Sequence, residues 1–404
     1  MVKWARSFRM RILRVITRLN IGGPSIQAIS LTTRFAERGH ATTLIHGRLD
    51  RGEGDMTYLA PPGAALTFVS TLCRPISPLN DLRSLFRLWR LMRQFEPDII
   101  HTHMAKAGLI GRCAARAFNF GRRRKARVIH TYHGHVLEGY FSAAKTAVFI
   151  MLERMLARWS DAIVAISPAI RRELLEGHRI GRAGQYHVVP LGFDLSVFAS
   201  VDDGARIAAR QSLGIDARAR VVTTVGRLTA IKQHALFLET FARVAATDAN
   251  AIALVVGDGE LRAEIDAKAA ALGISDRIRM LGWRRDLAAV YAATDVFLLT
   301  SRNEGTPVAL IEAMASGVPG VSTDVGGVGD VIHNRQVGRL AAFGDADGLA
   351  AAVTELLADE GARRESGAAA RAHVLGRYGV ERLVDDLDLL YQRLPAEETR
   401  GACR

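Results

Sequence analysis

Short hydrophobic runs alternate with longer amphipathic stretches along the whole 404-residue chain. The runs are rich in Val, Ile and Leu, which is typical of buried β-strands. We expect strands at 12–17, 41–46, 66–70, 98–103, 128–133 and 162–166, and again at 220–225, 251–257, 277–281, 295–300, 318–323 and 337–340. Because helical segments separate the strands, the pattern predicts right-handed βαβ units and parallel sheets, an α/β protein with two doubly wound, Rossmann-like domains.

The periodicity breaks at 188–205, a stretch that contains Pro, Gly and acidic residues. We expect domains at 1–192 and 193–378, followed by a C-terminal segment at 379–404. Within that segment Leu383, Leu387, Leu390 and Leu394 form one helical stripe. The stripe predicts a helix that packs on one face, but periodicity does not identify its partner.

Composition narrows the functional classes. The net charge is +13, from 54 Lys and Arg against 41 Asp and Glu, which favours anionic surfaces, phosphorylated ligands or nucleic acid. The basic runs at 3–14 and 122–127 show no nucleic-acid-reading motif, so we expect no nucleic acid partner. Three scattered cysteines, Cys73, Cys113 and Cys403, argue against a disulfide framework or a zinc ribbon and favour a reducing compartment.

The sequence leaves the relation to a membrane open. No apolar stretch approaches the ~18 residues of a membrane span, and the basic start lacks a signal-peptide core. The basic runs, Trp4, Phe8 and the stretch 146–159 suggest docking on anionic lipid, whereas a solvated charged face with a core helix explains them equally well. We expect a cytosolic protein that can act at the inner membrane face.

Two stretches could face a phosphate. At 17–40 a strand end is followed by Gly22 and Gly23 and then by a helix, so backbone N–H groups could meet an anion, although such turns also need glycine for structural reasons. At 223–234, Arg227 and Lys232 follow the strand end and could bind a phosphate or remain solvated.

The stretch 301–317 carries two carboxylates at an apolar helix. We expect Pro307 to be the first helical residue, with Glu304 just before the helix and Glu312 inside it. Because the helix is apolar on all sides, Glu312 should be buried and should need a hydrogen-bonding partner. That partner could be a protein group or the vicinal hydroxyls of a ligand such as a ribose.

Five histidines, His101, His103, His130, His133 and His135, lie close together in the sequence. The HxH spacing on a strand places His101 and His103 on one face. A zinc site is conceivable, but no carboxylate or cysteine at ligand spacing completes it, so we expect no metal.

Taken together, the glycine loop, GRL with its downstream lysine, GDGEL at 257–261 and EGTPVALIE at 304–312 resemble the GT4 family of GT-B glycosyltransferases over nearly the whole chain. Glu304 and Glu312 match the family's Glu-x7-Glu signature. Gly320 and Asp330 are mild departures, since the family usually has a β-branched residue and Glu there. The resemblance also implies that the C-terminal helix returns to the N-terminal domain.

The resemblance implies a role for each matching residue. Arg227 and Lys232 would bind the diphosphate, Glu304 the donor sugar and Glu312 the ribose, while His133 would lie near the sugar. The remaining donor contacts would come from Gly22, Gly23, Gly257, Glu260, Leu261, Trp283, Arg284, Gly305, Thr306, Pro307 and Val308.

The implied activity is retaining, metal-independent transfer of a hexosyl group, without a cofactor, from a nucleotide-diphosphate sugar, most simply a UDP-sugar. The acceptor would be a glycan or a lipid-linked glycan in the synthesis of bacterial surface polysaccharide. A nucleotide-sugar 2-epimerase and a non-catalytic sugar-nucleotide binder are the alternatives.

Overall fold

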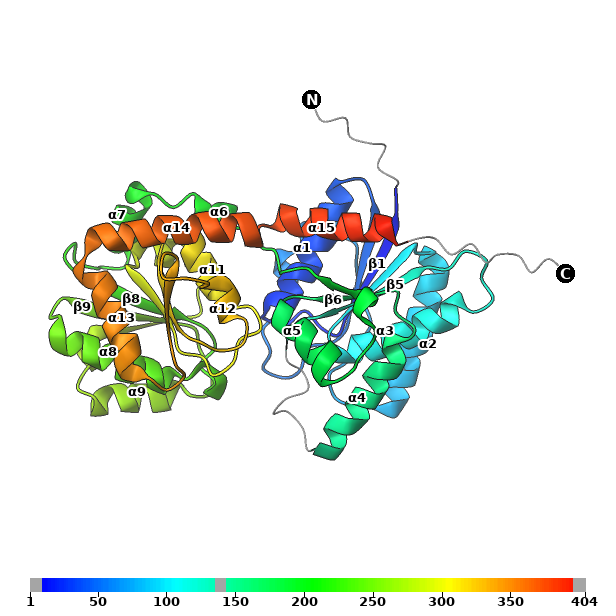
Figure 1. The fold of residues 1–404 in the computed structure, drawn as a ribbon, viewed down its shortest axis with the longest axis horizontal. Coiled ribbons are helices and arrows are strands. Elements are labelled where there is room, and N and C mark those ends of the chain that lie inside the picture. Colours follow the sequence, from blue (N-terminus) through cyan, green and yellow to red (C-terminus); the bar gives the residue numbers. More distant parts are fainter. Residues whose placement is uncertain (1–8, 135–142, 395–404) are drawn as a thin grey trace, which may run out of the picture. The chain divides into compact units, whose positions relative to one another are not determined.

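The structure is a computed structural model that describes residues 9–134 and 143–394. The chain divides into two compact units, each with its own parallel sheet (Figure 1). The first unit comprises Met1–Phe193 and Val380–Arg404, and the second comprises Asp194–Gly379.

The first unit has a seven-stranded sheet in the order β3-β2-β1-β4-β5-β6-β7. Its strands are β1 (Arg11–Ile16), β2 (Ala41–His46), β3 (Leu66–Phe68), β4 (Ile99–His103), β5 (Arg127–Tyr132), β6 (Ala162–Ala165) and β7 (Tyr186–Val188). Its α-helices are α1 (Gly23–Glu37), α2 (Pro78–Phe95), α3 (Ala105–Asn119), α4 (Ala143–Ala157), α5 (Pro168–Arg172) and α15 (Val380–Arg393), with shorter helical turns at Thr57–Leu59, Glu173–Gly177 and Ala183–Gln185.

The second unit has a six-stranded sheet in the order β10-β9-β8-β11-β12-β13. Its strands are β8 (Arg220–Val225), β9 (Ala251–Val256), β10 (Ile278–Gly282), β11 (Val296–Leu299), β12 (Gly320–Thr323) and β13 (Gly338–Ala341). Its α-helices are α6 (Ser196–Ala199), α7 (Asp203–Ser212), α8 (His234–Thr247), α9 (Arg262–Ala271), α10 (Leu287–Ala293), α11 (Val308–Ala315), α12 (Val328–Val331), α13 (Ala346–Ala358) and α14 (Glu360–Tyr378), with 3₁₀ turns η4 (Ala230–Lys232) and Ser275–Arg277.

All twelve strands predicted from the sequence are present, with ends within two residues of the expected positions. Sequence reasoning missed β7, whose three residues Tyr186, His187 and Val188 do not form an apolar run. The predicted α/β class with two Rossmann-like sheets is confirmed.

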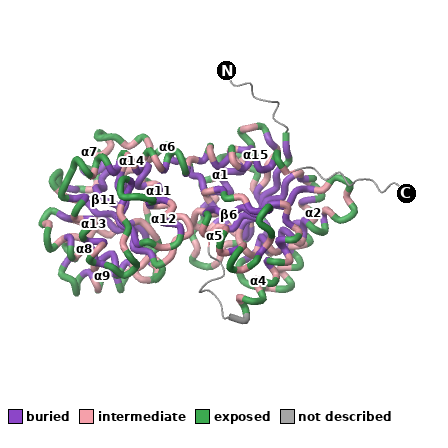
Figure 2. The backbone as a smooth tube through the Cα atoms, in the orientation of Figure 1, coloured by how far each residue is buried: buried purple, intermediate pink, exposed green. Residues whose placement is uncertain are grey.

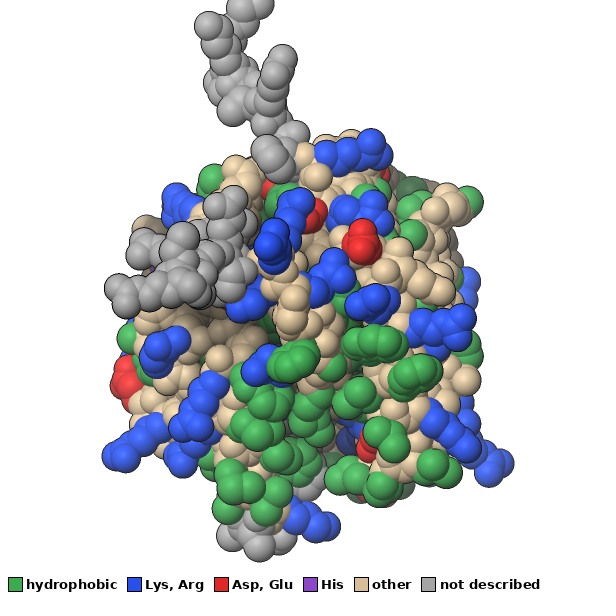
Figure 3. All heavy atoms as spheres, turned by 90° about the vertical axis from the view of Figure 1, so that its right-hand side faces the viewer, with side chains coloured by type: hydrophobic (Ala, Val, Ile, Leu, Met, Phe, Trp, Pro, Cys, Tyr) green, Lys and Arg blue, Asp and Glu red, His purple; other side chains and the backbone are tan. Residues whose placement is uncertain are grey.

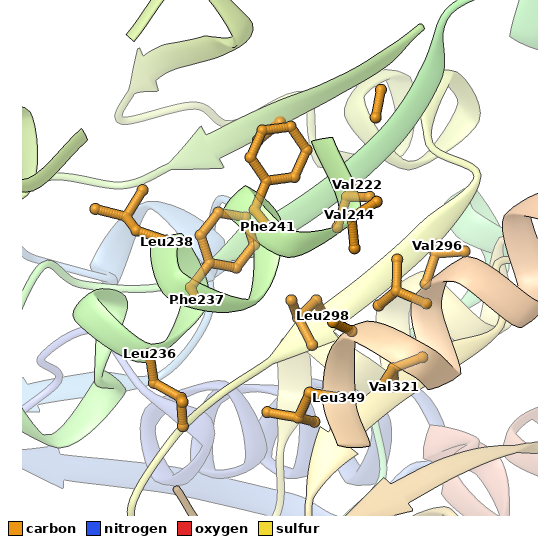
Figure 4. Close-up of a cluster of buried hydrophobic side chains, with 14 of the residues drawn as sticks. Val222, Leu236, Phe237, Leu238, Phe241, Val244, Val296, Leu298, Val321 and Leu349 are labelled. Carbon is orange, nitrogen blue, oxygen red and sulfur yellow. The ribbon is translucent and has the colours of Figure 1, made fainter. Parts of the chain in front are cut away.

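Alternating side chains build the core on both faces of each sheet. In the first unit Ile12 and Ile99 face the cluster that contains α1 and α15, whereas Leu13 and Ile100 face the cluster that contains α2 and α3. Figure 2 shows the buried strands inside each unit, with exposed positions on the outer helices. In the second unit Phe237 and Phe241 of α8 pack with strand residues such as Val222 and Leu298 (Figure 4).

Helix α15 completes the core of the first unit. Leu383 and Leu387 are fully buried there, Leu390 is buried and Leu394 is partly buried. The helix begins where the Val380 N–H donates to the Phe193 carbonyl, and it packs against α1. The predicted leucine stripe is therefore the buried face of this helix.

The strand order places a topological switch point in each sheet. β1 lies beside β4 in the first sheet, and β8 lies beside β11 in the second. Ligands of doubly wound folds bind at the carboxyl ends of strands around such a point. The loops that follow these four strands are therefore the places to look for a site.

Candidate functional site

The loop after β8 carries the two cations predicted from GRL and the downstream lysine. Arg227 is exposed, and no ion-pair partner is found for it among the residues that the structure describes. Lys232 ends the turn η4 and is only partly exposed. The site thus holds one guanidinium without an ion-pair partner among the described residues and one constrained ammonium group.

Glu304, in the loop after β11, constrains that ammonium group. Its Oε1 accepts from Lys232 Nζ at 2.6 Å and from Ser301 Oγ at 2.6 Å. The two loops are also joined through the backbone, where the Arg302 N–H donates to the Ile231 carbonyl at 2.8 Å. The structure therefore brings together Lys232 and Glu304, which lie 72 residues apart in the sequence.

Glycines allow neighbouring loops to approach the loops that follow β8 and β11. A Cβ on Gly326 or Gly327 would lie 2.1 Å from the Glu304 carbonyl oxygen or 2.0 Å from that of Gly305. A Cβ on Gly257 would lie 2.0 Å from the Gly226 carbonyl oxygen. Backbones approach this closely only where no side chain intervenes. The loops that hold Glu304 and Arg227 are thus each backed by a glycine loop.

Helix α11 presents its N-terminus beside Glu304. It begins at Val308, so the expectation that Pro307 is the first helical residue was wrong: Pro307 is the N-cap, with ψ of 87° outside the helical range. No side chain caps this end. The N–H groups of the first turn, together with Gly305 and Thr306, are therefore placed to meet an anion.

Glu312 lies within α11 and has a protein partner that the sequence did not reveal. Tyr291 of α10 donates its hydroxyl to Glu312 Oε2 at 3.2 Å. Burial raises the pKa of Glu312 to about 7, and the Tyr291 hydrogen bond only partly offsets this effect. Glu312 nevertheless keeps an intermediate exposure, so the expected burial is only partial. The carboxyl group has capacity left for a ligand.

The loops at Gly257 and Trp283, which the resemblance assigns to the donor, also contact each other. The Gly257 N–H donates to the Gly282 carbonyl at 2.9 Å, which places the GDGEL loop beside Trp283. Trp283 is 55% exposed, and Glu260 is also exposed. Leu261 donates its N–H to the Leu228 carbonyl, and Arg284 is already paired with Asp286 at 2.9 Å.

In the first unit Gly22 and Gly23 form the start of α1. Gly22 is the N-cap with φ of 155°, and no side chain caps the helix. Ser25 donates its hydroxyl to the Asn20 carbonyl at 2.6 Å, which fixes the turn. Pro24 has no N–H, and Ser25 and Ile26 donate theirs to the Gly22 carbonyl, so at this end of α1 the Gly23 N–H is the one left without a partner among the described residues.

Three of the predicted histidines, His101, His103 and His133, lie in contact with one another in the first unit. His101 bonds to the Tyr391 hydroxyl and to Thr131 at 2.7 Å each, and its ring stacks on that of His103 with 4.4 Å between centroids. His103 Nδ1 lies 3.0 Å from His133 Nε2. Burial lowers the pKa of His133 to about 3 and that of His103 well below its usual value, so both rings are neutral at pH 7.

Because a neutral imidazole has one donor and one acceptor nitrogen, the proton position on His103 determines that on His133. The second nitrogens, His103 Nε2 and His133 Nδ1, have no partner among the described residues. Within that part of the chain no group of three or more His, Cys, Asp and Glu side chains is arranged to hold a metal ion. His135 lies outside the described residues.

The basic runs are less exposed than expected. Arg14 is fully buried, with its guanidinium 4.9 Å from the Phe35 ring centre, and Arg127 is also buried. Arg14 belongs to the basic run 3–14 and also to the strand predicted at 12–17, and the structure buries it with that strand. Trp4 and Phe8 lie outside the described residues. No helix in the described part of the chain is long and apolar enough to cross a bilayer.

One of the departures from the family pattern has a packing reason. A Cβ on Gly320 would lie 2.4 Å from Leu310 Cδ1, so glycine leaves room for α11 against β12. The sequence could not show this, because the contact joins two separate elements.

Comparison with known proteins agrees with this geometry. Residues 205–373 match the family model described as glycosyl transferases group 1, and residues 21–197 match glycosyltransferase family 4. A D-inositol 3-phosphate glycosyltransferase from Geodermatophilus obscurus is 30% identical over 408 aligned residues, which cover 94% of this chain and 86% of the relative.

Two further likenesses bear on the fold and the reaction class. An Escherichia coli protein named UDP-Gal:alpha-D-GlcNAc-diphosphoundecaprenol alpha-1,3-galactosyltransferase is 29% identical over 310 residues, which cover 76% of this chain and 78% of that protein. The crystal structure of Anabaena HepE in complex with UDP has a TM-score of 0.80 at 21% identity and covers 95% of this chain and 100% of its own. The chain belongs to the group 1 glycosyltransferases of the GT4 family, retaining enzymes of the GT-B fold that use nucleotide-sugar donors.

Proposed function

We propose that this enzyme transfers a sugar, with retention, from a UDP-sugar to a lipid-linked glycan during the synthesis of cell-surface polysaccharide. The observation that carries the donor side is the Lys232–Glu304 pair, with Arg227 and the uncapped end of α11 at the same sheet edge. Cations and helix N–H groups suit a diphosphate, and a carboxylate beside them suits sugar hydroxyls.

Each residue then has a role within the second unit. Arg227 and Lys232 bind the diphosphate and stabilise its negative charge as the glycosidic bond breaks. These two side chains supply the positive charge that a metal ion would otherwise supply. Glu304 orients the donor sugar. Glu312 accepts from the ribose hydroxyls, and Trp283 offers an exposed ring to the base.

In the first unit we assign His133 to the donor sugar and Gly22 and Gly23 to the diphosphate. A neutral His133 ring is suited to orienting a hydroxyl and donating one hydrogen bond, because its lowered pKa leaves no full positive charge at pH 7. The acceptor class rests on the E. coli relative, whose name specifies a diphosphoundecaprenol-linked sugar.

Product analysis with a panel of sugar nucleotides tests this function. A new glycoside on a lipid-linked acceptor supports it, whereas an epimerised sugar nucleotide or an unchanged ligand contradicts it.

Substitution tests the cations. Arg227→Ala and Lys232→Ala should each lower kcat by about two to three decades, comparable to the loss of one oxyanion-type donor. Arg262→Ala, which removes an exposed arginine of α9 paired with Asp266, is the matched control and should leave kcat unchanged. Near-normal turnover in both site variants would remove these residues from the site.

A further inference from the structure

Helix α2 exposes an apolar row as well as burying one. Its inner side chains Leu88 and Met92 are fully buried. On the outer side of its first half, Leu79, Leu82 and Phe86 are 60%, 65% and 60% exposed. Their spacing of three and four residues places them on one stripe. This stripe is not part of the core of the first unit.

The outer side of α2 also carries arginines, most of them in its second half. Arg83 lies beside the apolar stripe, Arg87, Arg90 and Arg93 follow it, and all four are exposed. The one acidic residue of the helix, Asp81, is paired with Lys106 at 2.6 Å. The outward face of α2 therefore combines apolar with basic side chains, with no acidic side chain left unpaired on it.

Helix α4 carries a similar combination. Val148 and Met151 are 52% and 62% exposed, and the exposed basic residues are Lys145 before them, Arg154 after them and Arg158 just beyond the helix end. Its one acidic residue, Glu153, is buried against Arg112 at 2.7 Å. Two separate helices of the first unit thus present exposed apolar side chains together with basic ones.

Chain direction aligns the two helices. α2 follows β3 and α4 follows β5, so each helix starts near the carboxyl edge of the same parallel sheet. α3 lies next to both of them. Figure 3 shows this face of the molecule, where hydrophobic side chains gather toward the lower end and Lys and Arg side chains lie around and above them. His103 and His133 lie at the same sheet edge, at the ends of β4 and β5.

The positive charge of the outward faces of α2 and α4 indicates which kind of partner they can bind. A second copy of the chain would bring the same arginines against each other, which opposes association. An anionic bilayer offers acyl chains to the apolar side chains of the helices and phosphates to the basic ones. A lipid-linked acceptor is itself held in a bilayer, so it would be presented at the carboxyl edge of the sheet.

We propose that the outward faces of α2 and α4 form a docking surface for an anionic bilayer, in which Leu79, Leu82, Phe86, Val148 and Met151 enter the lipid boundary and the arginines meet lipid phosphates. The purpose of docking rests on the proposed lipid-linked acceptor, whereas the docking itself is measured without any acceptor.

The test is co-sedimentation of the full chain with vesicles of phosphatidylglycerol and phosphatidylethanolamine, and with phosphatidylcholine vesicles, at low and high salt. We expect binding to the anionic vesicles that weakens with salt. The double variant L82S/F86S should bind at least about tenfold more weakly, because it removes two inserted apolar side chains. The matched control is V197S/I207S, which changes side chains that are 62% and 60% exposed in the second unit, and it should bind like the wild type.

Three results would overturn the proposal: equal binding of the wild type to both kinds of vesicle, unchanged binding of L82S/F86S, or an equal loss in V197S/I207S. If L82S/F86S has a lower molecular mass in solution than the wild type when no vesicles are present, the face is instead an interface between two copies of the chain. Transfer to a soluble, short-chain acceptor should be the same in all variants. If the wild type shows no transfer to the soluble acceptor, the proposed function is contradicted, whereas the measured vesicle binding is unaffected.

Discussion

At the scale of single residues, burial shifts the pKa values of Glu312 and His133 in opposite directions. Glu312 is an acid whose charged form is disfavoured by burial, so its pKa rises to about 7. His133 is a base whose charged form is disfavoured for the same reason, so its pKa falls to about 3. Near pH 7 the His133 ring is therefore neutral and Glu312 is only partly ionised, and each has an unused hydrogen-bonding position.

Donor binding should release a proton from Glu312. Ribose hydroxyls that donate to the carboxylate favour its ionised form, so UDP-sugar affinity should rise between pH 6 and 8, with release of up to about one proton at pH 6 and little at pH 8. Calorimetric titration in buffers of different ionisation enthalpy measures this release. Glu312→Gln should abolish it and weaken binding by ~1–2 kcal/mol, roughly five- to thirtyfold.

The raised pKa of Glu312 also predicts how the stability of the folded protein depends on pH. The folded protein binds more protons than the unfolded chain between the ordinary value of 4.5 and about 7, so Glu312 costs stability progressively as pH rises through that window. Glu312→Gln should thus melt at least as high as the wild type at pH 8. A lower melting temperature with unchanged donor affinity would show that Glu312 is a structural partner of Tyr291 instead.

His103 should act as a positioning residue for His133. Because the two neutral rings share one hydrogen bond, His103→Ala should lower kcat about tenfold with little change in the KM for the donor. In a His133→Ala background the same change should have almost no further effect on kcat. Additive losses in the double variant would contradict the coupling, and His103→Asn, which keeps a polar group, should recover part of the rate.

At the scale of elements, the loops after β8 and β11 are held by close backbone contacts as well as by side-chain bonds such as Lys232–Glu304. Gly327 is the clearest position at which to test the backbone contacts, because its φ of −87° suits alanine and only the 2.0 Å approach to the Gly305 oxygen forbids a Cβ.

Gly327→Ala should destabilise the second unit by ~1–3 kcal/mol through overpacking and should weaken UDP-sugar binding, since Glu304 and Gly305 must move. Gly329→Ala is the matched control, because its Cβ would meet only Asp324 Oδ1, at 3.6 Å. Thermal melts and donor titration of both variants measure the difference. Equal behaviour of the two alanine variants would show that the loop tolerates displacement.

At the scale of the whole molecule, the chain has two separate cores, and its last helix belongs to the first. Leu387 of α15 is 1% exposed in the first core, and Leu349 of α13 is fully buried in the second. The polypeptide therefore leaves the first unit, builds the second and returns to complete the first.

Leu387→Ala and Leu349→Ala should each cost ~2–5 kcal/mol, but in different units. Hydrogen exchange followed by mass spectrometry should show lost protection in β1, β4 and α1 for Leu387→Ala, and in β8, β11 and α8 for Leu349→Ala. UDP should restore protection mainly in the second unit. Loss of protection in both units from either change would mean that they unfold as one cooperative body.

Much of this protein was readable from the sequence alone. The run pattern predicted twelve strands, because buried parallel strands are apolar along their whole length. The motif set predicted the family and placed Arg227, Lys232 and Glu304 on second-unit loops and Glu312 in the helix that follows, because strand-to-helix turns mark the carboxyl edge of a sheet. The leucine stripe predicted the buried face of α15.

Tertiary structure decided the partners. The pairing of Lys232 with Glu304, of Glu312 with Tyr291 and of His103 with His133 joins residues that local pattern does not connect. Arg14 looked like part of a basic surface and is buried, whereas Leu79, Leu82 and Phe86 look like core residues and are exposed. Periodicity reports which residues share a helix face, but only the packing of neighbouring elements determines which face meets the core and which meets solvent or lipid.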